Sequence, residues 1–123
     1  MPALALLVQA AAWIALGTTS TGNAVFADKR SVRTVDGIVH ATVKVVYAKP
    51  VATPKGPLGG AVTKAMFDCA KRTVAVKEST LYHDMARRTV YSKTVVGKPG
   101  FGPQMRGTFA QVALEGLCRG TSR

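Results

Sequence analysis

Residues 38–49 read IVHATVKVVYAK, a stretch in which apolar and polar side chains alternate. In an extended chain, one face would carry the apolar set, which is Val39, Ala41, Val43, Val45 and Tyr47. The opposite face would carry His40, Thr42 and Lys44. A period of two with one polar face is typical of a strand in an antiparallel sheet that has one side in water. The stretch therefore predicts such a sheet.

The segments on both sides of this strand extend the predicted sheet. Asp36-Gly37, directly before it, is a strong signal for a short hairpin turn. Further strands are expected at residues 12–19, 23–28, 32–35, 63–69, 73–82 and 88–96. Pro50–Gly60 (PVATPKGPLGG) and Gly97–Gly107 are instead expected to be irregular loops, because Pro and Gly interrupt them. The first loop is either a plain connector or a surface segment that binds a partner.

The last element changes from the period of a strand to that of a helix. Thr108, followed three residues later by Gln111, resembles a capping box. Helical spacing continues through Phe109, Val112, Ala113, Gly116 and Leu117. A short amphipathic helix ending near Cys118 is predicted, and its apolar stripe requires the apolar face of the sheet. The fold class is therefore α+β, with a C-terminal helix packed on one face of an antiparallel sheet.

Length and charge limit the classes of function. At 123 residues the chain is one domain, and its 47% apolar content argues against disorder. The formal net charge is +11, which attracts polyanions such as nucleic acid, anionic lipid, lipopolysaccharide and sulfated sugar. Yet the 17 Lys and Arg are scattered without any run longer than two. The sequence therefore predicts a basic surface but no basic arm.

The N-terminus indicates the compartment. Residues 1–12 form an uncharged apolar run, and Val8-Gln9-Ala10 fits a signal-peptidase site, although the usual basic start is missing. We expect a truncated signal peptide at residues 1–10 and a single domain at residues 11–123; a buried N-terminal strand is the alternative. The apolar run from 3 to 17 is too short to span a membrane. The expected location is the periplasm, the outer-membrane surface or the exterior.

Cys69 and Cys118 are the two cysteines of the chain. In an exported protein they are expected to form one disulfide, which would tie the C-terminal helix to the sheet. Two reduced structural cysteines in a cytosolic protein are the alternative. A zinc site is excluded, because the sequence has no CxxC motif and no cluster of His and Cys.

Catalytic chemistry has little support in the sequence. No nucleophile elbow, P-loop, HExxH motif or dinucleotide fingerprint occurs. His40 and His83 are the two histidines. In Tyr82-His83-Asp84, adjacent strand residues would point to opposite faces, so His83 would not converge with its neighbours. We therefore predict no enzyme, no catalytic residue, no metal and no cofactor. The roles of the two histidines and the binding residues stay unassigned.

A series of landmarks along the chain resembles the surface-adhesin protein E family of exported bacterial proteins. The landmarks are Trp13, Asp28-Lys29-Arg30-Ser31, Tyr47-Ala48-Lys49-Pro50, Phe67-Asp68-Cys69, Arg72, Tyr82, Gly107-Thr108 and Cys118. The resemblance covers Ala12 to Cys118. It departs from the family pattern near Phe101, where a tryptophan is expected, and in the Pro50–Gly60 loop.

This resemblance implies a curved antiparallel sheet of about six strands, with a C-terminal helix tethered to one face by a disulfide. It also implies a non-enzymatic binding module that attaches to host extracellular-matrix or serum proteins, such as vitronectin and laminin. The charge supports an alternative, a cationic binder of lipopolysaccharide, heparin-like glycans or nucleic acid. No membrane-spanning segment is expected, and a homodimer is left open.

Overall fold

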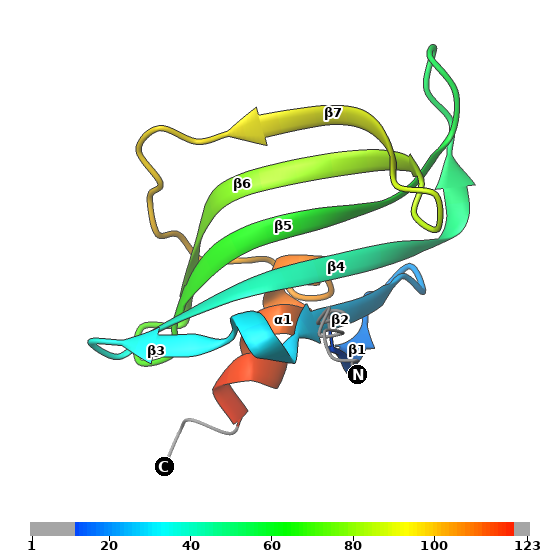
Figure 1. The fold of residues 1–123 in the computed structure, drawn as a ribbon. Coiled ribbons are helices and arrows are strands. Elements are labelled where there is room, and N and C mark those ends of the chain that lie inside the picture. The colour runs from blue at the N-terminus through cyan, green and yellow to red at the C-terminus, as the bar shows by residue number, and fades with distance from the viewer. Residues whose placement is uncertain (1–11, 120–123) are drawn as a thin grey trace, which may run out of the picture.

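The computed structural model describes residues 12–119, which form a seven-stranded antiparallel sheet and a C-terminal helix (Figure 1). The expected signal segment at residues 1–10 lies outside the described residues. The strands are β1 (Trp13–Thr18), β2 (Ala24–Asp28), β3 (Arg33–Val35), β4 (Ile38–Val51), β5 (Leu58–Asp68), β6 (Thr73–Asp84) and β7 (Thr89–Val95). A 3₁₀ turn, η2 (Lys29–Ser31), joins β2 to β3, and the helix is α1 (Phe109–Arg119).

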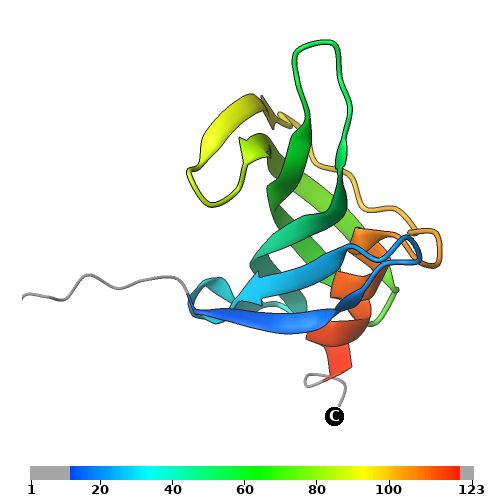
Figure 2. The ribbon, with the colours of Figure 1, turned by 90° about the vertical axis from the view of Figure 1, so that its right-hand side faces the viewer.

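The order of the strands is β1-β2-β4-β5-β6-β7, and β3 pairs with β4 beside the end of β2. The sheet is open, and α1 lies against one of its faces (Figure 2). The predicted α+β class, with an antiparallel sheet and a helix on one face, is confirmed.

The alternation in β4 separates the two faces as predicted. The side chains directed toward α1 are almost fully buried: Val39, Ala41, Val43 and Val45. They meet the buried positions of the helix, which are Ala110, Ala113, Leu114, Leu117 and Cys118. On the opposite face His40, Thr42 and Lys44 are half-buried. Among residues 12–119, the core therefore lies on the α1 side of the sheet, and the β4 side chains on the other side are only partly buried.

The Asp36-Gly37 hairpin is confirmed between β3 and β4. Asp36 and Gly37 have φ angles of 51° and 80°. Positive φ at both central residues is the requirement of a type I′ turn, whose twist matches that of the flanking strands. Asp and Gly are among the residues that adopt this conformation at low cost.

Ser31 bridges the gap between β2 and β3, which pair with successive parts of β4. The ladder between β2 and β4 ends at Ala27 opposite Val43, and the ladder between β3 and β4 begins at Arg33 opposite His40. In the gap, the Thr42 amide donates to the Ser31 hydroxyl at 2.9 Å. The same hydroxyl donates to the Asp28 carbonyl at 2.7 Å. A side chain therefore supplies the partner that a strand residue would otherwise provide.

The predicted Pro50–Gly60 loop is too long. β4 continues to Val51 and β5 begins at Leu58, which pair with each other, so the connection between the strands is residues 52–57. Pro50 is accommodated where the ladder is irregular, between Val46 and Val51. A Cβ atom on Gly60 would collide with the Val45 carbonyl oxygen and would lie 2.8 Å from the Met85 sulfur. This glycine therefore marks a close contact inside a strand and not a turn.

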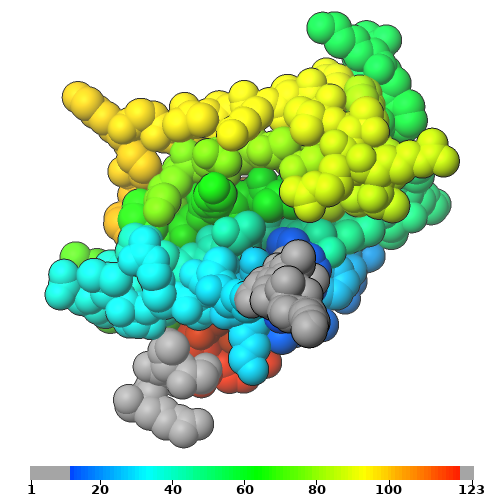
Figure 3. Space-filling model, viewed as in Figure 1, coloured from blue at the N-terminus to red at the C-terminus, as the bar shows by residue number. Residues whose placement is uncertain are grey.

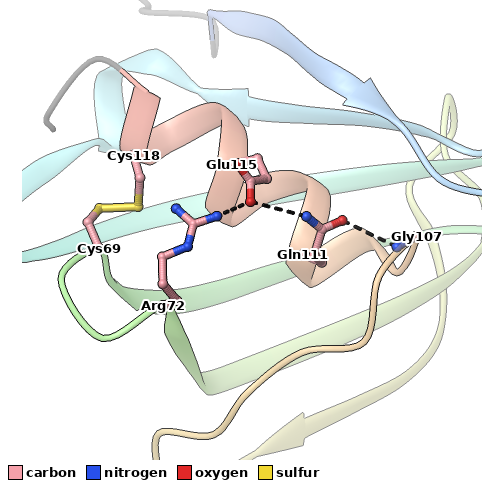
Figure 4. Close-up of polar contacts among 6 residues, drawn as sticks. All are labelled: Cys69, Arg72, Gly107, Gln111, Glu115 and Cys118. Atoms are coloured by element: carbon pink, nitrogen blue, oxygen red, sulfur yellow. Dashed lines mark hydrogen bonds and ion pairs between the residues drawn. A yellow bond between two sulfur atoms is a disulfide. The ribbon is translucent and has the colours of Figure 1, made fainter.

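Cys69 and Cys118 form the predicted disulfide, with an S–S distance of 2.07 Å and a Cα–Cα distance of 5.5 Å. Cys69 lies just beyond the end of β5, so the bond fixes the β5–β6 turn to the last turn of α1 (Figure 4). At the other end of the helix, the Gln111 amide donates to the Thr108 hydroxyl at 3.3 Å. The Gln111 side chain accepts from the Gly107 amide at 3.2 Å, and both contacts satisfy donors at the start of the helix.

Candidate binding face

The face of the sheet opposite α1 is hollowed over its middle strands (Figure 3). Three adjoining hollows, of about 190, 330 and 210 Å³, share walls along this face. The first two share Trp13, Val62, Tyr82 and Arg88, and the last two share Thr42 and Lys64. We call this continuous depression the open groove. It runs across the face from β1 and β7 toward β3.

Cations dominate the walls of the open groove. They come from five strands and the turn before β7, and they are Arg33, Lys44, Lys64, Lys77, Arg88 and Lys93. The carboxylates lining it are Asp28 and Glu78. Glu78 lies 3.8 Å from the Lys64 ammonium and 3.6 Å from the Lys93 ammonium, so one carboxylate faces two cations. The groove therefore keeps an excess of positive charge, which favours an anionic partner.

Lys44 is held at the centre of the groove by aromatic rings. Its ammonium lies 4.2 Å from the centre of the Trp13 ring and 5.1 Å from that of Phe26. Both distances are within the range of cation–π attraction. Burial, and then the nearby Arg88 guanidinium, lower the pKa of Lys44. Lys44 is thus a partly desolvated cation, which gains more from an anion than a fully hydrated lysine would.

A separate hollow of about 330 Å³ lies on the helix side, beside the start of α1. It is lined by apolar and polar uncharged side chains, among them Val45, Leu81 and Phe109, and no charged side chain from the described part of the chain lines it. The Thr63 and Ser79 hydroxyls hydrogen-bond to each other at 3.2 Å within its wall. Burial raises the pKa of Tyr47, another lining residue. The two faces of the sheet therefore offer very different surfaces.

The two histidines have different surroundings and different roles. His83 Nδ1 is 2.7 Å from the Pro57 carbonyl oxygen, and its ring packs edge-on against Tyr91 at 5.1 Å. This histidine fixes the connection between β4 and β5. Its neighbour Asp84 instead accepts from the Arg87 amide at 3.0 Å, so the Tyr82-His83-Asp84 stretch does not assemble a site. His40 lines the open groove at its β3 end.

The clustering of the cations is not predicted from the sequence, because they lie on different strands and never in a run. The alternation of apolar and polar residues does indicate part of this cluster, since Lys44 and Lys64 occupy polar positions of two predicted strands. Their strands pair, with Lys44 opposite Val62 and Thr42 opposite Lys64, which brings the two cations to one face.

A comparison with protein families identifies the chain. The model of the family described as surface-adhesin protein E matches residues 13–119. The chain belongs to the surface-adhesin protein E family. Its expected landmarks, including Cys69, Arg72 and Cys118, lie within this range. No curated protein is significantly similar to the chain.

Solved structures with this fold include protein E of Haemophilus influenzae. One structure of that protein has a TM-score of 0.57 at 16% identity, covering 88% of this chain and 84% of that chain. A second, described as crystal form II, has a TM-score of 0.57 at 15% identity, with coverage of 80% and 83%. At this identity the similarity shows a shared fold. Among residues 12–119, no helix has the length and apolar character of a membrane span, and no three His, Cys, Asp or Glu gather as a metal site would require.

Proposed function

We propose that this protein is an exported, non-enzymatic surface adhesin that attaches to its partner through the open groove. Membership of the surface-adhesin protein E family supports this function. One observation decides the choice of surface. Six cations gather on the face of the sheet that no helix of residues 12–119 covers, while α1 occupies the opposite face. The partners would be host extracellular-matrix or serum proteins that present acidic segments.

Binding to immobilised vitronectin and laminin tests this proposal. Lys44→Gln combined with Arg88→Asn removes two groove cations; Asn suits the positive φ of 57° at Arg88. The matched control is Lys55→Gln with Lys98→Gln, which removes two charges from exposed loops outside the groove. We expect the groove variant to lose at least about tenfold in affinity and the control to change little. Equal losses in both variants, or no binding by the unaltered protein, would contradict the proposal.

A second candidate function is the binding of anionic polymers, such as lipopolysaccharide or heparin-like glycans. The specific observation in its favour is the imbalance in the groove between six cations and two carboxylates. Retention on heparin across a salt gradient separates the two candidates. For a polyanion binder, the logarithm of the binding constant falls linearly with the logarithm of the salt concentration, because binding releases counterions. Retention beyond about 0.5 M salt would indicate a dedicated anion site, since screening is then strong.

Export is part of the proposal and is tested by N-terminal sequencing of protein from its native host. We expect a mature chain that begins near Ala11, directly after the Val8-Gln9-Ala10 site. The disulfide between Cys69 and Cys118 supports an oxidising compartment. An intact Met1 on protein recovered from the cytosol would contradict export.

A further inference from the structure

The hollow at the β3 end of the open groove differs from the middle hollow, which Asp28 and Glu78 line, because no carboxylate of residues 12–119 lines it. Its volume is about 210 Å³, and its polar walls come from Ser31, Arg33, His40, Thr42, Lys64 and Lys77. This volume is several times the roughly 30 Å³ that one water occupies in the liquid. The hollow therefore has room for a small hydrated anion.

Two cations converge here without a carboxylate partner. Arg33 on β3 lies directly opposite His40 on β4. Lys77 reaches the same hollow because β6 carries an extra residue there: Lys64 pairs with Glu78, and Ala65 pairs with Val76. The ion pairs found among the described residues include Lys64 with Glu78 but involve neither Arg33 nor Lys77. These two charges are therefore available to a ligand.

His40 adds a titratable wall to this hollow. Its Nδ1 atom is buried and has no hydrogen-bond partner within residues 12–119. Burial, and then the positive charges of Arg33 and Lys77, lower the pKa of the imidazole. Lys64 of β5 is the remaining charged group in the hollow. An anion placed among these groups would offset their mutual repulsion and favour the protonated imidazole.

We propose that this hollow is an oxyanion site, which binds a phosphate or sulfate group between Arg33 and Lys77 with His40 in its wall. A guanidinium matches the paired oxygens of such groups, and an ammonium adds a point charge. The physiological ligand of this site rests on the second candidate function, the binding of anionic polymers. The site adds to that function the chemical group that is recognised. It predicts that binding strengthens as His40 becomes protonated.

Sodium sulfate is the first probe, because sulfate keeps its charge across the relevant pH range. The Cε1 proton of His40 is followed by NMR from pH 5 to 8, in sulfate and in sodium chloride of equal ionic strength. We expect sulfate to raise the His40 midpoint by at least about half a pH unit relative to chloride, and affinity to be higher at pH 5.5 than at pH 7.5. Equal midpoints in the two salts would overturn the proposal.

Two double variants test the residues. Arg33→Gln with Lys77→Gln should weaken sulfate binding at least about tenfold, since two charge-assisted hydrogen bonds are lost. Lys55→Gln with Lys98→Gln removes equal charge elsewhere and should change affinity less than about twofold. Equal weakening in both would show generic attraction and overturn the site. Circular dichroism checks that each variant is folded.

Competition identifies the source of the bound group. Short heparin fragments present sulfate, and lipopolysaccharide micelles present phosphate; sulfate should displace whichever one uses this hollow. The Lys44→Gln/Arg88→Asn variant should keep sulfate binding even if it loses the adhesion partner. Failure of the oxyanion site and failure of the adhesin proposal therefore give different results.

Discussion

Arg72, in the turn between β5 and β6, forms an ion pair with Glu115 of α1 (Figure 4). Each member lies three residues from a cysteine of the Cys69–Cys118 bond. Glu115 also accepts from the Gln111 side chain at 3.3 Å, which extends the contact toward the start of the helix. The Cys-x-x-Arg pattern thus provides a covalent and an ionic contact from one turn to one helix.

The disulfide should supply most of the stability in this pair of contacts. It spans 49 residues, for which chain entropy predicts roughly 4 kcal/mol. Cys69→Ser with Cys118→Ser should therefore lower Tm by roughly 10–25 °C and loosen α1, while the sheet largely persists. Arg72→Gln removes the half-exposed ion pair of the same turn and should lower the free energy of unfolding by at most about 1 kcal/mol. Thermal unfolding followed by circular dichroism measures both, and a larger loss in Arg72→Gln would reverse this ranking.

Gly60 should tolerate no side chain. Its Cβ position is occupied by the Val45 carbonyl oxygen, which belongs to the backbone and cannot rotate away. Gly60→Ala should lower the free energy of unfolding by about 1–3 kcal/mol, as overpacking does in a tight core. Gly100→Ala is the control, because nothing lies within 4 Å of its Cβ position. Urea unfolding of both variants checks this, and equal stabilities would show that the strands can separate locally.

Ser31 should protect the amide of Thr42. Removing the hydroxyl in Ser31→Ala leaves this amide without its partner at 2.9 Å, at a cost of about 1–3 kcal/mol. Hydrogen exchange resolved at single amides should show faster exchange at Thr42, while the Thr34–Val39 pair in the next ladder changes less. Unchanged exchange at Thr42 would mean that water replaces the hydroxyl without loss.

Stability should fall on mild acidification because of His40. The pKa of His40 in the folded protein lies below its ordinary value of 6.5, chiefly through burial and then through Arg33 and Lys77. The unfolded chain therefore binds more protons, and the free energy of unfolding decreases as the pH falls below about 6.5. Urea unfolding at pH 7.5 and pH 5.5 should show a smaller decrease for His40→Asn than for the unaltered protein.

The sequence predicted elements whose causes are local. The alternation of residues 38–49, the Asp36-Gly37 turn and the helix beginning after Thr108 depend on neighbours within a few residues, and all are confirmed. The end of β4 and the start of β5 depend on a distant contact instead. Gly60 faces Met85, 25 positions along the chain, and no local pattern distinguishes such a glycine from one in a turn.

The proposed binding face could be predicted only in part, for a similar reason. The alternation places Lys44 and Lys64 on the polar sides of their strands, but the full set of groove cations is brought together by the order of the strands and by the extra residue at Lys77. The disulfide was predictable because two cysteines and one apolar helix stripe leave few arrangements. The oxyanion hollow was not, since it requires the precise register that places Arg33 opposite His40.

The separation of β4 into a buried and an open side has an evolutionary consequence. Substitutions at Val39, Ala41, Val43 or Val45 act on packing against α1, whereas substitutions at His40, Thr42 or Lys44 act on the solvent side. Selection for a new partner can therefore rewrite every second residue of a strand while the intervening residues are conserved for folding. Two lineages could diverge to the 16% identity seen with the Haemophilus influenzae protein, retain one architecture, and recognise unrelated molecules.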